Sequence, residues 1–331
     1  MSDVPAATSE PPEVQPPAVA RIKQIADRIK ADVGGVFMGA DHIVESLLIA
    51  LLGRGHILLE GVPGVAKTTL VRAFARTLDA RFNRIQFTPD LLPSDITGVY
   101  VPNLQTGEFL LREGPIFSNI VLGDEINRAP AKTQSALLEA MQERQVTIEG
   151  RTHKLEAPFL VLATQNPMEQ EGVYALPEAQ LDRFLLKVVV GYPSMEQEFR
   201  VLKTHQIPRA PLKAVINAPT VLEMTSIVDT VHVADELVQY IIKLARHTRD
   251  HAQVDLGVSP RAALALLVAT KARAAIHGRD YVLPDDVRAL ASTVFSHRII
   301  LSPQAQLGGL GPQDVVRQAI QKIRYSEAPP R

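Results

Sequence analysis

The sequence predicts an α/β domain built on a parallel five-stranded sheet, followed by a small domain made of helices alone. Three observations support this fold class. Strand-like and helical segments alternate from residue 21 to residue 192, only helical segments follow residue 219, and a glycine-containing loop joins the first strand to a helix. Strands that alternate with helices are typical of a parallel sheet covered by helices on both faces.

The composition is that of a globular protein, with 331 residues, 46% of them hydrophobic, and a formal net charge of −1. This length favours two domains with a sizeable core, and the charge gives no reason to expect nucleic acid or a membrane surface as a partner. The absence of cysteine excludes disulfides, thiolate metal sites and a cysteine nucleophile. Neither a signal peptide nor a membrane-spanning stretch is recognisable, so we expect a cytoplasmic protein with no direct membrane insertion.

The strands of the first domain are predicted from short apolar runs. These runs are 56–60, 84–87, 120–124, 159–164 and 185–190. The segment Thr68–Leu78 between the first two runs places its apolar residues on one helical face. The alternation of strands and helices ends near residue 192.

The second domain is predicted from helical segments and their start signals. Pro260 follows Ser259, which fits a capping serine with proline in the first turn of a helix. The expected helices are 221–230, 235–250, 260–277, 284–296 and 312–323. We therefore divide the chain into a disordered tail (1–19), an α/β domain (20–192), a proline-punctuated linker (193–219), a helical domain (220–325) and a second disordered tail (326–331).

The strongest chemical signal is the loop after the first strand, Gly61-Val62-Pro63-Gly64-Val65-Ala66-Lys67-Thr68-Thr69. Its place between a strand and a helix is what a phosphate-binding loop requires. The loop amides and the helix N-terminus would face phosphate oxygens, Lys67 would reach the β- and γ-phosphates, and Thr68 would offer its hydroxyl to Mg²⁺. Ala66 stands where the standard pattern has its second glycine, and alanine is compatible with the first turn of a helix.

Two further strands end in polar residues. The run 120–124 ends in Asp124 and Glu125, two adjacent carboxylates that repel each other unless a cation lies near. We expect Asp124 to hold Mg²⁺, partly through water, and Glu125 to polarise the attacking water. Asn166 follows the strand at 159–164 and could donate to the γ-phosphate or orient the water, although an asparagine after a strand more often belongs to a turn.

Two arginines lack a purely local explanation. Arg261 lies in the first turn of the helix capped by Ser259, where a cation opposes the helix dipole, so a phosphate or an acid across the domain interface is expected to balance it. Arg183 precedes the last strand and could neutralise charge on a phosphoryl group bound by a neighbouring subunit. Asp182 and Glu178 are close enough in sequence to pair with Arg183 instead.

Together these stretches resemble the AAA+ ATPases and, among them, the MoxR family. Besides the loop at 61–68, the resemblance is carried by DEINRAP at 124–130, QSALLEAMQERQVTI at 134–148, ATQNPM at 163–168, LPEAQLDRF at 176–184 and SPRA at 259–262. It extends from Ile22 to Ile323 and implies a P-loop NTPase domain of AAA+ type followed by a small helical lid.

The resemblance also implies roles for individual residues. It identifies Lys67 and Thr68 as Walker A, Asp124 and Glu125 as Walker B, and Asn166 as the first sensor. The cofactors that it implies are ATP and Mg²⁺.

The resemblance further implies a homo-oligomeric ring, expected to be a hexamer, that hydrolyses ATP between subunits. Arg183 corresponds to the arginine finger, which acts in trans, and Arg261 to the second sensor, through which the lid would close. Arg128 is a weaker candidate for a contact between subunits. Members of the family resemble chaperones that remodel or mature client proteins, with von Willebrand factor A domain proteins among the expected clients.

Two loops could touch such a client, although a purely structural role is equally compatible with their composition. The resemblance identifies 92–109 as an insertion in the second helix and 143–156 as a hairpin before the first sensor. The alternation of residues around Gly150 independently favours a hairpin. An alternative function is a nucleotide-gated scaffold that recruits a partner with little turnover, for which Glu125 would not be needed.

Overall fold

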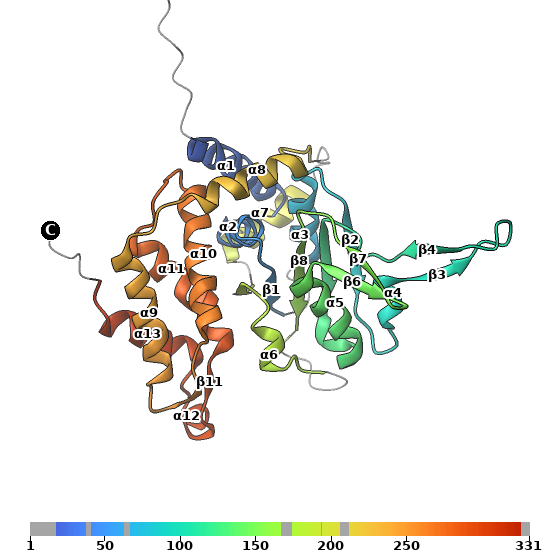
Figure 1. The fold of residues 1–331 in the computed structure, drawn as a ribbon. Coiled ribbons are helices and arrows are strands. Elements are labelled where there is room, and N and C mark those ends of the chain that lie inside the picture. The colour runs from blue at the N-terminus through green and yellow to red at the C-terminus, as the bar shows by residue number, and fades with distance from the viewer. Residues whose placement is uncertain are drawn as a thin grey trace, which may run out of the picture.

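The computed structural model describes residues 18–37, 41–62, 67–166, 174–192, 194–205 and 212–325. A five-stranded sheet with flanking helices forms one half of the molecule, and a group of helices forms the other half (Figure 1). The predicted fold class, an α/β domain with a helical lid, is confirmed.

The sheet is parallel throughout, with the strand order β2-β5-β8-β1-β9. Every predicted strand is found within two residues of its expected bounds, as β1 Ile57–Glu60, β2 Phe82–Gln86, β5 Ile120–Asp124, β8 Leu160–Gln165 and β9 Leu186–Val189. Because the strands are parallel, their carboxyl ends meet at one edge of the sheet. The polar residues that follow β1, β5 and β8 are thereby brought to the same edge.

Successive strand residues point to opposite faces of the sheet, and each face has its own core. Ile57 and Leu59 belong to a core that includes the helices before and after β1, whereas Leu58 belongs to a core on the α5 face. The helices of this half are α1 Ala18–Val36, α2 Asp41–Leu52, α3 Lys67–Arg76, α4 Pro93–Thr97, α5 Ala131–Glu143 and α6 Glu178–Leu181, with a short 3-10 turn, η1, at Ile126–Arg128.

Two antiparallel hairpins extend from this half. The predicted hairpin within 143–156 is confirmed as β6 Gln145–Ile148 and β7 Arg151–Lys154. The second hairpin, β3 Gly98–Pro102 and β4 Phe109–Glu113, protrudes as an arm from the body of the molecule (Figure 1).

The lid contains the predicted helices together with a small sheet that the sequence did not indicate. Its helices are α8 Ala218–Asp229, α9 Asp235–Arg249, α10 Pro260–Ile276, α11 Pro284–Phe295, α12 Pro303–Leu307 and α13 Pro312–Lys322, with a 3-10 turn, η2, at Ser296–Arg298. The expectation of helices alone was wrong in one respect, because β10 Val254–Leu256 and β11 Ile300–Leu301 pair antiparallel. Strands of two or three residues are too short to produce a recognisable alternation.

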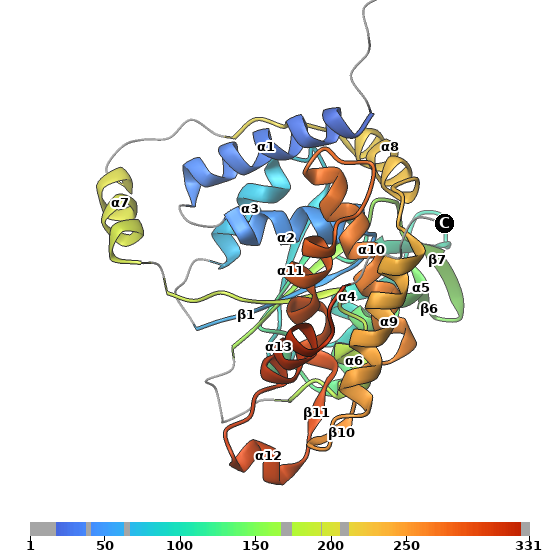
Figure 2. The ribbon, with the colours of Figure 1, turned by 90° about the vertical axis from the view of Figure 1, so that its left-hand side faces the viewer.

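The lid and the sheet half share one hydrophobic core. The first two helices pack against α10, and both α2 and α11 contact β9. Figure 2 shows α10 beside α2, whereas α7 (Met195–His205) stands apart from the rest. Among the described residues, none of the helices combines the length and apolar content needed to span a membrane.

The ends of the predicted segments differ from the structure in two places. The tail was expected to reach residue 19, but α1 begins at Ala18 and Val19 is buried in the core; residues 1–17 and the predicted tail at 326–331 lie outside the described residues. The predicted linker contains α7 and the start of α8. The prolines that suggested a linker misled here, because Pro219 occupies the first turn of α8, where its missing N–H costs no hydrogen bond.

Candidate functional site

The end of β1 and the start of α3 bring Lys67 to the carboxyl edge of the sheet. The Lys67 ammonium donates to the carbonyl of Gly61 and lies 3.5 Å from the carbonyl of Gln165, so it stands between the ends of β1 and β8. A methyl group on Gly61 would lie 2.4 Å from the carbonyl oxygen of Val190, which explains why glycine is required there. The loop residues Pro63, Gly64, Val65 and Ala66 lie outside the described residues.

Asp124, the last residue of β5, lies against the first turn of α3. The Thr68 hydroxyl donates to Oδ2 of Asp124 at 3.0 Å, and the Thr164 hydroxyl donates to Oδ1 at 2.5 Å. Burial alone would raise the pKa of Asp124, but hydrogen bonds from Thr164, Arg84 and Thr68 lower it below its ordinary value. Asp124 is therefore an anion held beside a hydroxyl, although its side chain is only 8% exposed.

Arg84, on the neighbouring strand β2, supplies the cation beside Asp124. Its Nε and Nη2 atoms donate to Oδ2 of Asp124 at 3.0 and 2.6 Å. The same guanidinium also donates to the side-chain oxygen of Gln86. Two residues on the same side of β2 thus reach the Walker B end of β5.

Glu125 directly follows Asp124 at the end of β5. It adopts a left-handed backbone conformation with φ of 58°, which side-chain-bearing residues seldom take. Oε2 of Glu125 accepts a hydrogen bond from Gln86 at 2.9 Å and pairs with Nε of Arg128 at 3.2 Å. The backbone N–H of Glu125 donates to the Thr164 hydroxyl at 2.9 Å, so Thr164 on β8 holds both Asp124 and Glu125.

Asn166 lies at the end of β8 and is 3% exposed. The Asn127 amide donates to the Asn166 carbonyl at 3.3 Å, and the Asn127 carbonyl accepts from the Tyr174 N–H at 2.7 Å. Gln134 donates to the Tyr174 carbonyl at 2.9 Å. Asn127 and Gln134 thereby hold both ends of the segment 167–173, which lies outside the described residues.

These groups can hold a magnesium nucleotide. Mg²⁺ binds proteins through one or two oxygen ligands and completes its shell with water and phosphate. The Thr68 hydroxyl and the Asp124 carboxylate are such a pair, and Lys67 provides the charge for phosphate at the same edge. Within the described part of the chain, no group of three or more His, Cys, Asp or Glu side chains that could hold a metal ion is found.

The two arginines that the sequence singles out lie at the opposite edge of the sheet. Arg183 follows α6, and Leu185 donates its N–H to the carbonyl of His56, at the amino end of β1. In the described part of the chain, the Arg183 guanidinium forms neither a hydrogen bond nor an ion pair. Its expected partner Asp182 is bound instead by Arg298 at 2.6 Å.

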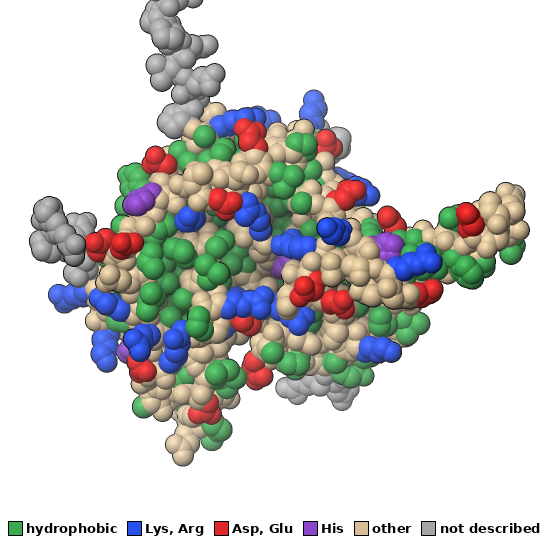
Figure 3. Space-filling view, in the orientation of Figure 1, with side chains coloured by type: hydrophobic (Ala, Val, Ile, Leu, Met, Phe, Trp, Pro, Cys, Tyr) green, Lys and Arg blue, Asp and Glu red, His purple; other side chains and the backbone are tan. Residues whose placement is uncertain are grey.

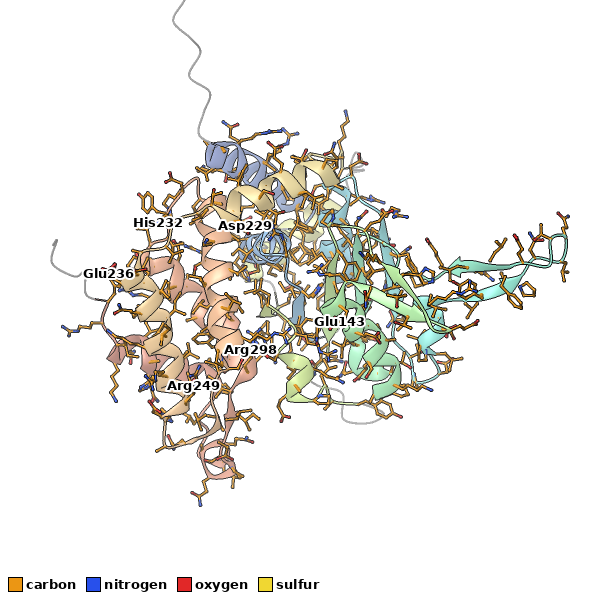
Figure 4. The ribbon with its side chains drawn as sticks, viewed as in Figure 1. Glu143, Asp229, His232, Glu236, Arg249 and Arg298 are labelled. Atoms are coloured by element: carbon orange, nitrogen blue, oxygen red, sulfur yellow. The ribbon has the colours of Figure 1, made fainter. Side chains whose placement is uncertain are left out.

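Arg261 lies near the same edge, because its charge acts on Arg298. Burial is the main cause that lowers the pKa of Arg298, and Arg261 lowers it further, whereas Asp182 raises it. Arg298 lies at the junction between the lid and α6, where basic side chains gather (Figures 3 and 4). Among the described residues, the expected acid across the interface is not found for Arg261.

The edge with Lys67 and the edge with Arg183 are separated by the length of β1, about 13 Å for four residues. From the sequence we expect the lid to close through Arg261. In this structure the lid meets the amino edge of the sheet, where Arg298 and His297 bond to the carbonyl of Phe184 just before β9. The charge of Arg261 acts on Arg298 at this junction.

The two hairpins contact each other through side chains of β3 and β7. The Tyr100 hydroxyl lies 3.1 Å from Nε2 of His153, and Arg151 lies over the Tyr100 ring at 5.0 Å. The arm formed by β3 and β4 exposes Leu104 and Phe109, with 95% and 63% of each residue accessible. These contacts join the two loops for which a client-binding role was expected. The exposed Leu104 and Phe109 give the arm an apolar surface.

Sequence reasoning missed Arg84, Gln86 and Thr164. The signal available for the first two was a pair of polar residues at alternate positions of an otherwise apolar strand. Their targets are 40 and 39 residues away in the chain, so only the strand order reveals them. Thr164 was predicted as a strand residue, and nothing in its sequence neighbourhood indicates that it bonds the Asp124 carboxylate and the Glu125 backbone N–H.

Two family models match this chain. The ATPase family associated with various cellular activities (AAA) matches residues 56–186, and the AAA lid domain matches residues 246–319. The first match contains Lys67, Asp124 and Arg183, and the second contains Arg261 and Arg298.

Similar proteins extend over most of the chain. The chaperone MoxR1 of Mycobacterium tuberculosis is 44% identical over 306 residues, which cover 90% of this chain and 81% of MoxR1. YeaC of Bacillus subtilis, an uncharacterized protein, is 49% identical, with 88% of this chain and 92% of YeaC covered. A crystal structure from Cytophaga hutchinsonii, described as that of an ATPase, superposes with a TM-score of 0.87 at 41% identity, over 93% of this chain and 97% of the other.

Proposed function

This chain belongs to the MoxR-type AAA+ ATPases, and we propose that it hydrolyses Mg²⁺·ATP between the subunits of a homo-oligomeric ring, a hexamer, to remodel protein clients. The observation that carries the nucleotide part is the contact between Thr68 and Asp124 at 3.0 Å, beside Lys67 at the end of β1. Its relatives include a protein named as a chaperone, and the family resemblance implies clients such as von Willebrand factor A domain proteins.

The residues at the carboxyl edge of the sheet would have separate roles in binding the nucleotide. Bound Mg²⁺ supplies charge neutralisation on the phosphate oxygens, with Thr68 and Asp124 as its protein ligands. Lys67 exchanges the Gly61 carbonyl for the β- and γ-phosphates. Loop amides from Gly61 to Thr69 bind the remaining phosphate oxygens.

Turnover requires that Glu125 be released from its present partners. Gln86 and Arg128 both hold its Oε2 atom, and release frees that oxygen for a water molecule. When released, Glu125 polarises the attacking water, and Asn166 senses or orients the group in transfer. Arg128, a weaker candidate from the sequence for a contact between subunits, is one of the two partners that Glu125 leaves in this proposal.

The ring is supported by the positions of Arg183 and Arg261. Both lie at the edge opposite Lys67, and neither forms an ion pair with another described residue. A neighbouring subunit that presents its Lys67 edge to this edge would receive both cations. Arg183 then stabilises the transferred phosphoryl group in trans, and Arg261 acts on the same neighbouring nucleotide.

The client is expected at the two hairpins, since the β3–β4 arm exposes apolar side chains and the hairpins touch each other through Tyr100 and His153. A cytoplasmic location is part of this proposal, because the reaction needs a supply of ATP. One observation favours the alternative of a nucleotide-gated scaffold with little turnover, namely that Glu125 is engaged by Gln86 and Arg128.

The ATPase rate per subunit, measured against protein concentration together with the particle mass, tests this proposal. A ring enzyme gives a rate per subunit that rises as the mass changes from that of a monomer to that of the ring. A constant rate per subunit on a monomer contradicts the ring. Assembly on ATP with negligible turnover in the wild-type chain supports the scaffold.

A further inference from the structure

We propose that Arg84 is an internal counter-cation that competes with Mg²⁺ for Asp124, and thereby sets the Mg²⁺ concentration at which the nucleotide binds. This inference rests on the proposed function, because it takes Asp124 as a ligand of the metal. It assigns a role to a residue outside the loop and strand-end motifs that the sequence singled out.

The carboxylate oxygen that faces the Thr68 hydroxyl is already fully occupied. Oδ2 of Asp124 accepts hydrogen bonds from Thr68 at 3.0 Å and from two nitrogen atoms of Arg84 at 3.0 and 2.6 Å. A carboxylate has about four lone-pair positions on its two oxygens, and Oδ1 is taken by Thr164. A metal ion, or a water bound to it, can reach Oδ2 only if one of these donors leaves.

Arg84 is the donor that leaves most readily. The Thr68 hydroxyl is itself expected to bind the metal, and it can keep its hydrogen bond to Asp124 while its oxygen lone pairs face Mg²⁺. Arg84 is a permanent cation, and its guanidinium would lie within a few bond lengths of the divalent ion that Asp124 holds. Repulsion between the Arg84 guanidinium and Mg²⁺ therefore favours the release of Arg84 from Asp124.

The position of Arg84 gives it room to move. It lies on β2, which is the edge strand of the sheet, and its side chain is 40% exposed although that of Asp124 is 8% exposed. The neighbouring Ile85 is buried and fixes the strand, so release of the guanidinium requires only rotation of the side chain. The displaced guanidinium enters water, where its charge is solvated.

The same contact explains why Asp124 tolerates its burial without the metal. A buried carboxylate needs a partner, and Arg84 provides a charge-assisted one. Exchange of Arg84 for Mg²⁺ leaves Asp124 compensated before and after the nucleotide binds. Arg84 thus raises the Mg²⁺ concentration needed for binding. It also compensates the charge of Asp124 until the metal is bound.

The test is a MgCl₂ titration of the binding of a fluorescent ATP analogue to the full chain, with Arg84→Gln, Arg84→Lys and wild type compared. Loss of a charge-assisted hydrogen bond is equivalent to about tenfold in an equilibrium constant, so Arg84→Gln is expected to reach half-maximal binding at about tenfold lower Mg²⁺. Arg84→Lys keeps the charge but loses the second donor, and a smaller shift is expected. A second readout without nucleotide is the rise in melting temperature on addition of MgCl₂, which should be larger for Arg84→Gln than for wild type.

Arg81→Gln is the matched control. Arg81 lies immediately before the same strand and pairs with Glu156 at the surface, away from Asp124, so its substitution should leave the Mg²⁺ requirement unchanged. An unchanged or higher Mg²⁺ requirement in Arg84→Gln would overturn the inference and leave the proposed function intact. Nucleotide binding that does not depend on Mg²⁺ in the wild-type chain would remove the metal role of Asp124, and this inference with it.

Discussion

Arg298 binds Asp182 across the junction between the lid and the sheet half, with Nε of the guanidinium 2.6 Å from Oδ1 of the carboxylate. The same guanidinium donates to the carbonyls of Asp182, Phe184 and Val294. Because Asp182 is engaged by Arg298, the adjacent Arg183 has lost the acid with which it was expected to pair. One ion pair therefore both joins the lid to the sheet half and leaves Arg183 without Asp182 as a partner.

Arg298→Leu should strongly destabilise the chain. The side chain of Arg298 is 4% exposed, and removal of one partner of a buried ion pair costs about 3–5 kcal/mol because the other partner and the carbonyls stay unpaired. We expect a loss of about 3 kcal/mol in the free energy of unfolding, measured by urea denaturation. Arg21→Gln is the control, since the pair of Arg21 with Glu223 is more than half exposed and should contribute no more than about 0.5 kcal/mol. Equal losses in the two variants would show that the junction does not depend on Arg298.

Lys67→Ala and Glu125→Gln should separate nucleotide binding from turnover. Without the Lys67 ammonium the phosphates lose their main cation, so nucleotide binding should be abolished. Glu125→Gln keeps the shape of the side chain but removes the base, so ATP should bind while hydrolysis falls by about 100-fold or more. Binding of a fluorescent ATP analogue and phosphate release measure the two steps. A wild-type rate of hydrolysis in Glu125→Gln would rule out the assigned mechanism.

Mixing of inactive subunits should show which chain each arginine serves. Arg183→Ala and Lys67→Ala subunits are each expected to be inactive alone, and a mixed ring contains interfaces in which an intact Lys67 site faces an intact Arg183. Some ATPase activity should return on mixing. The same recovery is expected when Arg261→Ala replaces Arg183→Ala, because Arg261 lies at the same edge of the sheet.

The second mixture distinguishes the two placements of Arg261. If Arg261 served the nucleotide of its own chain, every subunit with an intact Lys67 would lack it, and no activity would return. Co-purification of two differently tagged subunits verifies that mixed rings form. Recovery with Arg183→Ala but not with Arg261→Ala would contradict the role of Arg261 in trans.

His56 should make the fold sensitive to mild acid. Its Nε2–H donates to the Met141 carbonyl at 2.9 Å and its Nδ1 accepts the Val161 N–H at 3.0 Å, so the ring is held neutral. Burial and the charge of Arg144 lower the pKa of His56 to about 3, and that of His297 is also lowered, by burial and by Arg298, to about 3.

Between pH 6.5 and about 3 the unfolded chain therefore binds a proton at each histidine that the folded chain does not. Stability should fall as the pH decreases below 6.5, by about 1.4 kcal/mol per pH unit for each of the two histidines. Urea denaturation between pH 6.5 and 4.5 measures the slope. His56→Gln should reduce it by about half of the histidine contribution, and an unchanged slope would show that His56 is not held neutral.

The sequence by itself determined the parts of this protein that depend on neighbours in the chain. Apolar runs located the strands of the sheet to within two residues, and the stretches 61–68 and 120–125 located the phosphate loop and the two carboxylates. Strand alternation, helical periodicity and capping involve only a few neighbouring residues, so they can be recognised in the sequence alone. The set of residues at the carboxyl edge follows from these patterns once the strands are parallel.

The tertiary structure alone decided which distant residues meet. Arg84 reaches Asp124 only because β2 pairs with β5, and Thr164 bonds the Asp124 carboxylate and the Glu125 backbone only because β8 lies on the other side of β5. The position of Arg261 depends on the docking of the lid, where Arg298 joins Asp182 across 116 residues of chain. Such contacts are set by strand order and by the packing of whole helices on a shared core, and no local spacing encodes them.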